Sequence, residues 1–249
     1  MTEERITARK NPLLQRVRKL LSSRKERQEA GLYVADGTKL LEEAVKYAEL
    51  DTVILSDGVE ADLPQNVRLV RVPEDVMQSV SPMQTPQGAL FLCRIPQQKV
   101  FVPQKRMLLL DGIQDPGNLG TILRTADALQ VPVVLLEGCA DPYNHKTVRA
   151  YMGAVFRTPP VRAEWEQVKA ALQREKIPVG VTALSDTARD IRMWELRDMA
   201  VVIGSEGQGV RPQILEQADA RLIIPMDSRC ESFNAAVAAT IVLWQMTNL

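Results

Sequence analysis

The chain has 249 residues, of which 45% are hydrophobic and 25% are charged, as is usual for soluble globular proteins. Its 31 basic and 31 acidic residues cancel, so the net charge does not by itself indicate a polyanionic partner. No stretch approaches the roughly 18–20 apolar residues that a membrane span needs, and the first residues lack the apolar segment of a secretory signal. We expect a cytoplasmic protein of two compact domains.

The cysteine and histidine contents exclude several kinds of site. Cys93, Cys139 and Cys230 are far apart and form no C-x-x-C pair, which argues against a disulfide framework or a thiolate zinc site. His145 is the only histidine, which argues against a histidine metal site and a Ser-His-Asp triad. We therefore expect no metal and, if there is catalysis, an unusual general base.

The first 95 residues alternate between helical and strand patterns. The predicted elements are helices at 11–29 and 38–48, a short helix after Pro73, and strands at 32–34, 52–56, 67–72 and 88–94. This pattern predicts a small α/β domain over residues 1–95. Residues 96–105 contain two prolines and three glutamines without periodicity, and they are interpreted as a linker.

Basic residues are concentrated in the first thirty positions of this domain. This basic stripe comprises Arg5, Arg9, Lys10, Arg16, Arg18, Lys19, Arg24, Lys25 and Arg27. Such a stripe either binds phosphates or is a solvated helix face, and the residues alone leave both interpretations open.

Residues 106–249 have a different pattern, in which short continuous apolar runs alternate with helical segments. Such runs are typical of strands buried on both faces of a parallel sheet. The expected strands are 107–110, 133–136, 179–181, 200–203 and 222–224, and the expected helices are 118–129, 163–174, 211–217 and 231–247. A repeated strand–helix order predicts a doubly wound α/β domain.

Three segments follow buried strands, where ligands bind in open α/β sheets. In 108–129 a tight turn leads to Asn118, a candidate helix cap, and Arg124 projects from the helix beyond it. In 201–210 three glycines surround Ser205 and Glu206. In 222–245 a polar loop places Ser232 and Asn234 at the entrance of an apolar helix. Each segment alone is also explained by ordinary capping, a glycine-rich turn or a core helix.

Together, the three segments resemble the motifs of the SpoU (TrmH) family of RNA ribose 2′-O-methyltransferases, within the SPOUT class. The matching motifs are, in order, Asp115-Pro116-Gly117-Asn118-Leu119-Gly120 with Arg124-Thr125-Ala126, then Gly204-Ser205-Glu206-Gly207 with Gly209, then Ile224-Pro225-Met226 with Ser232-Phe233-Asn234. Residues 11–48 and Thr85-Pro86-Gln87-Gly88 resemble the ribosomal-protein-like RNA-binding domain that precedes many such catalytic domains.

The resemblance implies methyl transfer from S-adenosylmethionine to a ribose 2′-hydroxyl, preferably in ribosomal RNA. It also implies a C-terminal trefoil knot, a homodimer formed through the last helix, and RNA contact by the basic stripe. The implied catalytic residues are Arg124, Asn118, Glu206, Ser232 and Asn234, with Arg124 as general base or as electrostatic stabiliser of the alkoxide. The implied cofactor-binding residues are Thr182, Gly204, Ile224 and Phe233.

Four positions depart from the family pattern, among them Tyr151 in a place often held by serine and Asp36 in place of the more common glutamate before Gly37. Phe233 stands where leucine is usual, at a position that borders the cofactor in relatives, and the sequence leaves open whether its ring narrows the pocket. Gln130 replaces a frequent glycine. Two other functional classes have sequence requirements of their own. A non-catalytic RNA-binding scaffold would not need the five polar motif residues. A nucleotide-dependent oxidoreductase would need a glycine fingerprint after its first strand, which is absent from this sequence.

Overall fold

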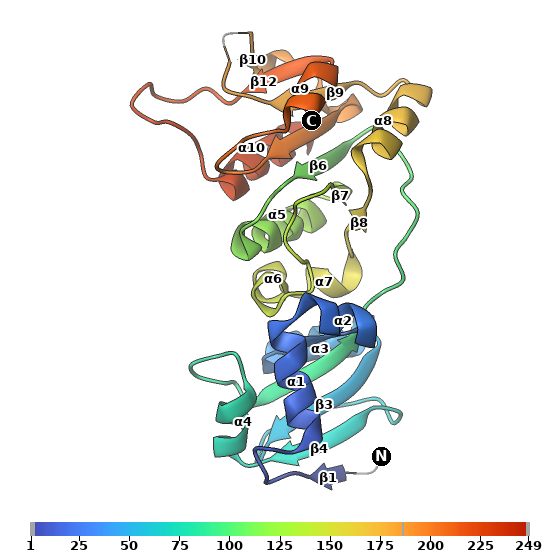
Figure 1. The fold of residues 1–249 in the computed structure, drawn as a ribbon, viewed down its shortest axis with the longest axis vertical. Helices are drawn as coiled ribbons and strands as arrows, with labels where there is room; N and C mark the ends of the chain where they lie inside the picture. Colours follow the sequence, from blue (N-terminus) through green and yellow to red (C-terminus); the bar gives the residue numbers. More distant parts are fainter. Residues whose placement is uncertain (1–2, 186, 248–249) are drawn as a thin grey trace. The chain divides into compact units, whose positions relative to one another are not determined.

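The computed structural model describes residues 3–185 and 187–247, which form two compact units (Figure 1). The first unit contains the described residues up to Gln97 together with Asp141–Pro159. The second contains Gln98–Ala140 and the described part of Pro160–Leu249. The predicted domains, 1–95 and 106–249, did not foresee that the segment 141–159 packs with the N-terminal residues.

A five-stranded mixed sheet forms the centre of the first unit, in the order β1-β4-β3-β5-β2. β5 is antiparallel to both β2 and β3, whereas β4 is parallel to β3 and β1. The strands are β1 (Glu3–Arg5), β2 (Leu32–Asp36), β3 (Leu50–Ser56), β4 (Arg68–Val72) and β5 (Ala89–Arg94). The helices are α1 (Pro12–Ser22), α2 (Arg24–Ala30), α3 (Thr38–Tyr47), α4 (Glu74–Val80), α6 (His145–Tyr151) and α7 (Ala154–Arg157). β1, α6 and α7 were not predicted.

The helix predicted at 11–29 is two helices, α1 and α2. Asn11 caps α1 as expected, because its side chain accepts from the Leu13 amide at 2.9 Å. Ser23 has an extended backbone, and its hydroxyl accepts from the Glu26 amide at 3.3 Å, so a new helix begins there. The apolar spacing ends with α1, and the buried side chain of α2 is that of Arg27.

The segment 141–159 completes the first unit through charged and aromatic contacts. Arg27 donates to Asp141 from Nε at 2.9 Å and from Nη2 at 2.7 Å; the Arg27 side chain is buried, and that of Asp141 is 13% exposed. Tyr143 packs against Tyr33 with ring centroids 4.9 Å apart, and Phe156 packs against Phe91. Arg27 is therefore a structural residue, although the sequence placed it in the basic stripe.

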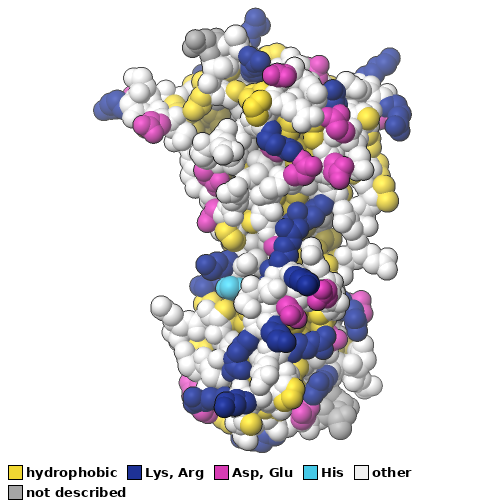
Figure 2. All heavy atoms as spheres, viewed as in Figure 1, with side chains coloured by type: hydrophobic (Ala, Val, Ile, Leu, Met, Phe, Trp, Pro, Cys, Tyr) yellow, Lys and Arg dark blue, Asp and Glu magenta, His cyan; other side chains and the backbone are white. Residues whose placement is uncertain are grey.

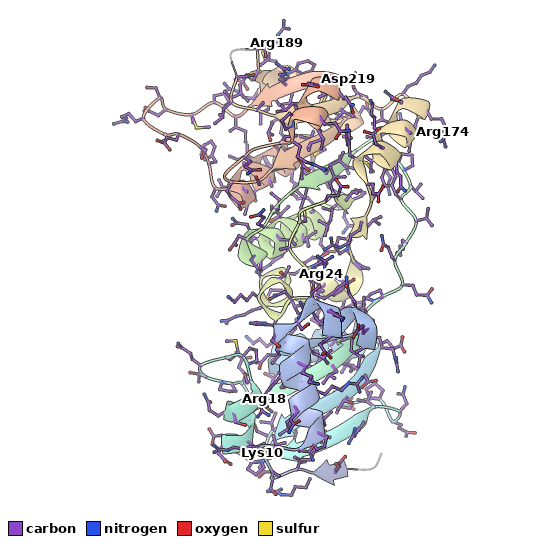
Figure 3. All side chains as sticks on the ribbon, in the orientation of Figure 1. Lys10, Arg18, Arg24, Arg174, Arg189 and Asp219 are labelled. Carbon is purple, nitrogen blue, oxygen red and sulfur yellow. The ribbon has the colours of Figure 1, made fainter. Side chains whose placement is uncertain are left out.

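Other members of the basic stripe remain on the surface of the first unit. Lys and Arg side chains gather over α1 and α2 in Figure 2, and Lys10, Arg18 and Arg24 lie along these helices in Figure 3. Arg5 and Arg9 form exposed ion pairs with Asp57 and Asp75. Among the residues that the structure describes, Lys10, Arg16, Arg18, Lys19 and Arg24 have no carboxylate within ion-pair distance.

The second unit is built on a seven-stranded parallel sheet in the order β10-β12-β9-β11-β6-β7-β8. The predicted parallel α/β domain is confirmed, with two short edge strands that were not predicted, whereas the trefoil knot stays a prediction. The strands are β6 (Met107–Asp111), β7 (Val133–Leu135), β8 (Val161–Arg162), β9 (Val179–Thr182), β10 (Arg189–Asp190), β11 (Ala200–Gly204) and β12 (Ala220–Ile223). All five residues of β6 are buried, as its continuous apolar run indicated.

Helices connect several of these strands, and one more helix follows the last strand. They are α5 (Pro116–Ala128), α8 (Trp165–Arg174), α9 (Pro212–Gln217) and α10 (Ala235–Thr247), with short 3₁₀ turns at Ile191–Met193 and Leu196–Asp198. None of the helices described in either unit is long and apolar enough to cross a membrane. Gln130, just after α5, has a φ of 54°, a left-handed conformation that explains why glycine is favoured there.

The buried ion pair yields a prediction about the stability of the first unit. Replacing Asp141 by alanine leaves the Arg27 guanidinium buried without its carboxylate, so the free energy of unfolding should fall by about 3 kcal/mol. Denaturant unfolding followed by circular dichroism measures this change. Asp75→Ala is the matched control, because it breaks an exposed pair with Arg9 and should cost less than about 1 kcal/mol. Equal losses in the two variants would contradict the assignment.

Candidate active site

The carboxyl ends of β9, β11 and β12 surround a cavity of about 640 Å³ in the second unit. These strands are neighbours in the sheet, so the loops that follow them meet at one edge. The lining includes the end of β9 and the residues after it, from Thr182 to Ser185, the glycine-rich loop 204–210, and residues of the loop after β12 between Ile224 and Phe233. The second and third motifs thus form one hollow, as their places after strands predicted.

The glycine-rich loop is a tight turn held by its own backbone. Ser205 and Gly209 exchange two amide–carbonyl hydrogen bonds of 3.0 and 2.9 Å, and Gly209 has a φ of 67°. A Cβ on Gly204 would lie 2.1 Å from the carbonyl carbon of Gly209, so only glycine fits at position 204. This packing places Glu206 at the exposed tip of the loop.

Three of the predicted catalytic side chains form a hydrogen-bonded chain. The amide nitrogen of Asn118 donates to the carboxylate of Glu206 at 2.5 Å. The amide nitrogen of Asn234 in turn donates to the amide oxygen of Asn118 at 3.1 Å. These residues come from α5, the loop after β11 and the entrance of α10, so the structure brings all three motifs together.

The caps of the two helices explain why these amides are available. Asp115, rather than Asn118 as predicted, caps α5, because its carboxylate accepts from the Asn118 backbone amide at 2.7 Å. The Asn118 side chain is therefore free to reach Glu206. Asn234 has both functions, since its side-chain oxygen accepts from the Ala236 amide at 2.9 Å while its nitrogen donates to Asn118.

The other predicted residues line the cavity, with one exception. Thr182, Gly204, Ile224, Ser232 and Phe233 all contribute to its walls. The Phe233 side chain is at the surface, with 37% of the residue exposed, and the cavity remains open beside it. Thr182 uses its hydroxyl to donate to the Val202 carbonyl at 3.2 Å, which ties β9 to β11.

Arg124 is the predicted residue that lies apart from this group. It is six residues beyond Asn118 on α5, which corresponds to about 9 Å along a helix axis and a different face. Its side chain is exposed and has no hydrogen bond or ion pair to another residue of the described part of the chain. Its guanidinium is therefore available to a ligand from outside the chain.

A buried charge that the sequence analysis missed lies behind the motifs. Asp111 ends β6 and is 1% exposed. It accepts from Arg211 twice, from the backbone amide at 2.8 Å and from Nε at 2.7 Å, and Arg211 also pairs with Glu137. Burial alone would lower the pKa of Arg211, but the hydrogen bonds and charges of Glu137 and Asp111 outweigh it and raise that pKa. A charged residue ending a buried strand was the available signal, because such a charge needs a partner.

Comparison with known families assigns both parts of the chain. A sequence model of the SpoU rRNA methylase family matches residues 105–244, which is more than half of the chain. A model of the MRM3-like substrate-binding domain matches residues 11–90. The two matches cover the regions whose motifs carried the resemblance.

Similar proteins extend over nearly the whole chain. The 23S rRNA (guanosine(2553)-2′-O)-methyltransferase of Bacillus subtilis (strain 168) is 35% identical over 232 residues, 92% of this chain and 93% of that protein. The AdoMet-bound rRNA methyltransferase from Sinorhizobium meliloti has a TM-score of 0.85 at 28% identity, covering 98% of this chain and 97% of that one. A TrmH-family protein from Porphyromonas gingivalis has a TM-score of 0.82 at 30% identity, covering 94% of this chain and 96% of that one. The chain therefore belongs to the SpoU rRNA methylase family, whose members are S-adenosylmethionine-dependent ribose 2′-O-methyltransferases.

Proposed function

We propose that this chain methylates a ribose 2′-hydroxyl of ribosomal RNA in the cytoplasm, with the reaction at the hydrogen-bonded group Glu206–Asn118–Asn234. The observation that carries the proposal is this hydrogen-bonded chain beside the cavity, because it joins all three motifs at one point. The 35% identity to a 23S rRNA 2′-O-methyltransferase and the match to a substrate-binding domain support ribosomal RNA as the substrate.

The cavity fits S-adenosylmethionine in size and lining. Its volume of about 640 Å³ is within the roughly 300–1,000 Å³ usual for small-molecule sites. Ile224 and Phe233 supply apolar walls for an adenine ring, and Gly204 keeps the loop compact so that backbone groups face the hollow. We assign Thr182, Gly204, Ile224 and Phe233 to cofactor binding on this basis.

When bound, S-adenosylmethionine supplies a methyl group on a positively charged sulfur, which is a good electrophile. The residues of this chain then have to align the ribose hydroxyl and assist the loss of its proton. Asn118 orients Glu206 through its hydrogen bond, and Asn234 orients Asn118 in turn. Together with Ser232 these residues provide donors and acceptors for the ribose. Arg124 would act from the substrate side, as general base or by stabilising the developing alkoxide.

We assign RNA binding in the first unit to the unpaired members of the basic stripe. Lys10, Arg16, Lys19 and Arg24 are exposed on or beside α1 and α2. A surface of this kind binds phosphates by releasing counterions, and it carries no base specificity. The first unit would therefore hold the RNA, while the choice of nucleotide depends on the second unit.

We further infer that the protein is a homodimer that associates through α10. One face of this helix is buried in the second unit, whereas Val237, Ile241 and Trp244 lie on another face at helical spacing. Trp244 is 59% exposed and Val237 is 46% exposed, which leaves an apolar stripe without a partner in the described chain. A two-fold axis through such a stripe would bury it against its own copy.

The main experiment follows the transfer of a labelled methyl group to ribosomal RNA. The purified protein, labelled S-adenosylmethionine and 23S rRNA should yield label in alkali-resistant dinucleotides, because a methylated 2′-oxygen cannot attack its phosphate. Asn118→Asp places a second carboxylate beside Glu206 and should reduce transfer about 100-fold while cofactor binding is kept. Label in alkali-sensitive nucleotides, or unchanged transfer by the variant, would contradict the proposal.

The glycine-rich loop gives a prediction about cofactor affinity. Gly204→Ala would push a methyl group into the Gly209 backbone and displace the loop, so S-adenosylmethionine should bind at least about tenfold more weakly in calorimetry. Gly207→Ala is the matched control in the same loop, because a Cβ there meets no atom within 4 Å. An equal loss of affinity in both variants would argue against this assignment of Gly204.

The dimer is tested by measuring molecular mass in solution. Trp244→Glu should halve the mass observed by sedimentation equilibrium, because a charge would have to be buried in the interface. Val100→Glu is the control, since Val100 is 86% exposed but lies in the linker rather than on α10. A monomeric unmodified protein, or equal dissociation of both variants, would overturn the inference.

A further inference from the structure

Arg211 connects the carboxyl ends of three neighbouring strands. It directly follows the glycine-rich loop after β11, and it pairs with Asp111 at the end of β6 and with Glu137 after β7. β11, β6 and β7 are adjacent in the sheet. The Glu137 carbonyl also accepts from the Gly112 amide at 3.1 Å, so the chain after β7 is tied to the chain after β6 as well.

The contacts of Arg211 differ from those of ordinary surface ion pairs. Asp111 is almost completely buried and receives two donors from one residue, one from its backbone and one from its side chain. This two-point attachment fixes the direction of the chain as well as its distance from β6. In contrast, the Arg192–Asp190 pair joins residues two apart and involves an arginine side chain that is 70% exposed.

The position of this attachment matters for the site. The chain leaves the glycine-rich loop at Arg211 and leaves β6 at Asp111, and the loop beyond Asp111 leads directly into α5. Glu206 and Asn118 lie on these two segments and are joined by the hydrogen bond of 2.5 Å. The attachment behind the site therefore holds together the same two segments that the Asn118–Glu206 hydrogen bond joins within it.

We propose that Arg211 is a positioning residue for methyl transfer, which sets Glu206 against Asn118 by binding Asp111 and Glu137. It does not touch the substrate, and its effect is transmitted through the Asn118–Glu206 hydrogen bond. The kinetic test of this proposal rests on the proposed function. The ordering of the glycine-rich loop by Arg211 is measured without activity, by hydrogen–deuterium exchange.

A double-mutant cycle tests this transmission. Arg211→Gln should lower kcat about 30-fold, because displaced groups align the hydroxyl poorly. In an Asn118→Ala background the same change should lower kcat less than about threefold, since the hydrogen bond through which Arg211 acts is already absent. Arg211→Lys retains the charge without the planar fork and should recover part of the rate. Arg192→Gln, the control, should leave kcat unchanged.

A second variant separates positioning from stability. Asp111→Asn combined with Arg211→Met removes both charges and leaves an acceptor for the backbone amide of residue 211. It should raise the melting temperature above that of Arg211→Gln while kcat stays low. If this variant restores both stability and rate, or if Arg211→Gln lowers kcat equally in both backgrounds, Arg211 is not a positioning residue.

Hydrogen–deuterium exchange gives a readout that does not depend on activity. Amides of residues 205–210 should exchange at least about tenfold faster in Arg211→Gln than in the unmodified protein or in Arg192→Gln. Unchanged exchange would overturn the proposal even if the protein methylated no RNA. Absence of methyl transfer by the unmodified protein, with faster exchange in the variant, would instead contradict the proposed function alone.

Discussion

Backbone pairing in a sheet buried on both faces is the constraint on which the second unit depends. Each strand of that sheet has to run in the same direction as its neighbours, so the chain returns through helices and every following loop begins at the same edge. Asn118, Glu206 and Asn234 are far apart in sequence, yet they meet there. The parallel direction of the strands thus brings the site residues together, and hydrogen bonds within each loop fix their local conformation.

Division of hydrogen bonds between backbone and side chains makes that site polar and ordered. Asp115 satisfies the first turn of α5, and Asn234 satisfies the first turn of α10 with its oxygen alone. The side-chain nitrogen atoms of Asn118 and Asn234 then remain as donors. Asn118 donates to Glu206, and Asn234 donates to Asn118. The first turns of α5 and α10 therefore both position the site and supply its polar side chains, because the unpaired backbone amides of a helix terminus require hydrogen-bond acceptors.

Periodicity and motif order predicted the elements that are long or buried. They failed where a single hydrogen bond or ion pair determines the local structure. The apolar run of β6 and the helix start at Asn11 were predicted because local pattern determines them. The break at Ser23 depends on one hydroxyl bond. The motif residues around the cavity were found from their positions after strands, whereas Arg211 and Asp111 required knowledge of which strands are neighbours. Arg124 shows the converse, since its motif predicted a role but its position on α5 gives it no partner in the described chain.

The segment 141–159 has a consequence for the modularity of this architecture. It lies inside the stretch that matches the methylase family, yet it folds with the N-terminal residues. A fragment ending near residue 97 would lack the rings that cover Tyr33 and Phe91 and the carboxylate beside Arg27. Exchange of substrate-binding domains between relatives, by recombination or in the laboratory, therefore has to include this segment or replace its contacts with the N-terminal residues.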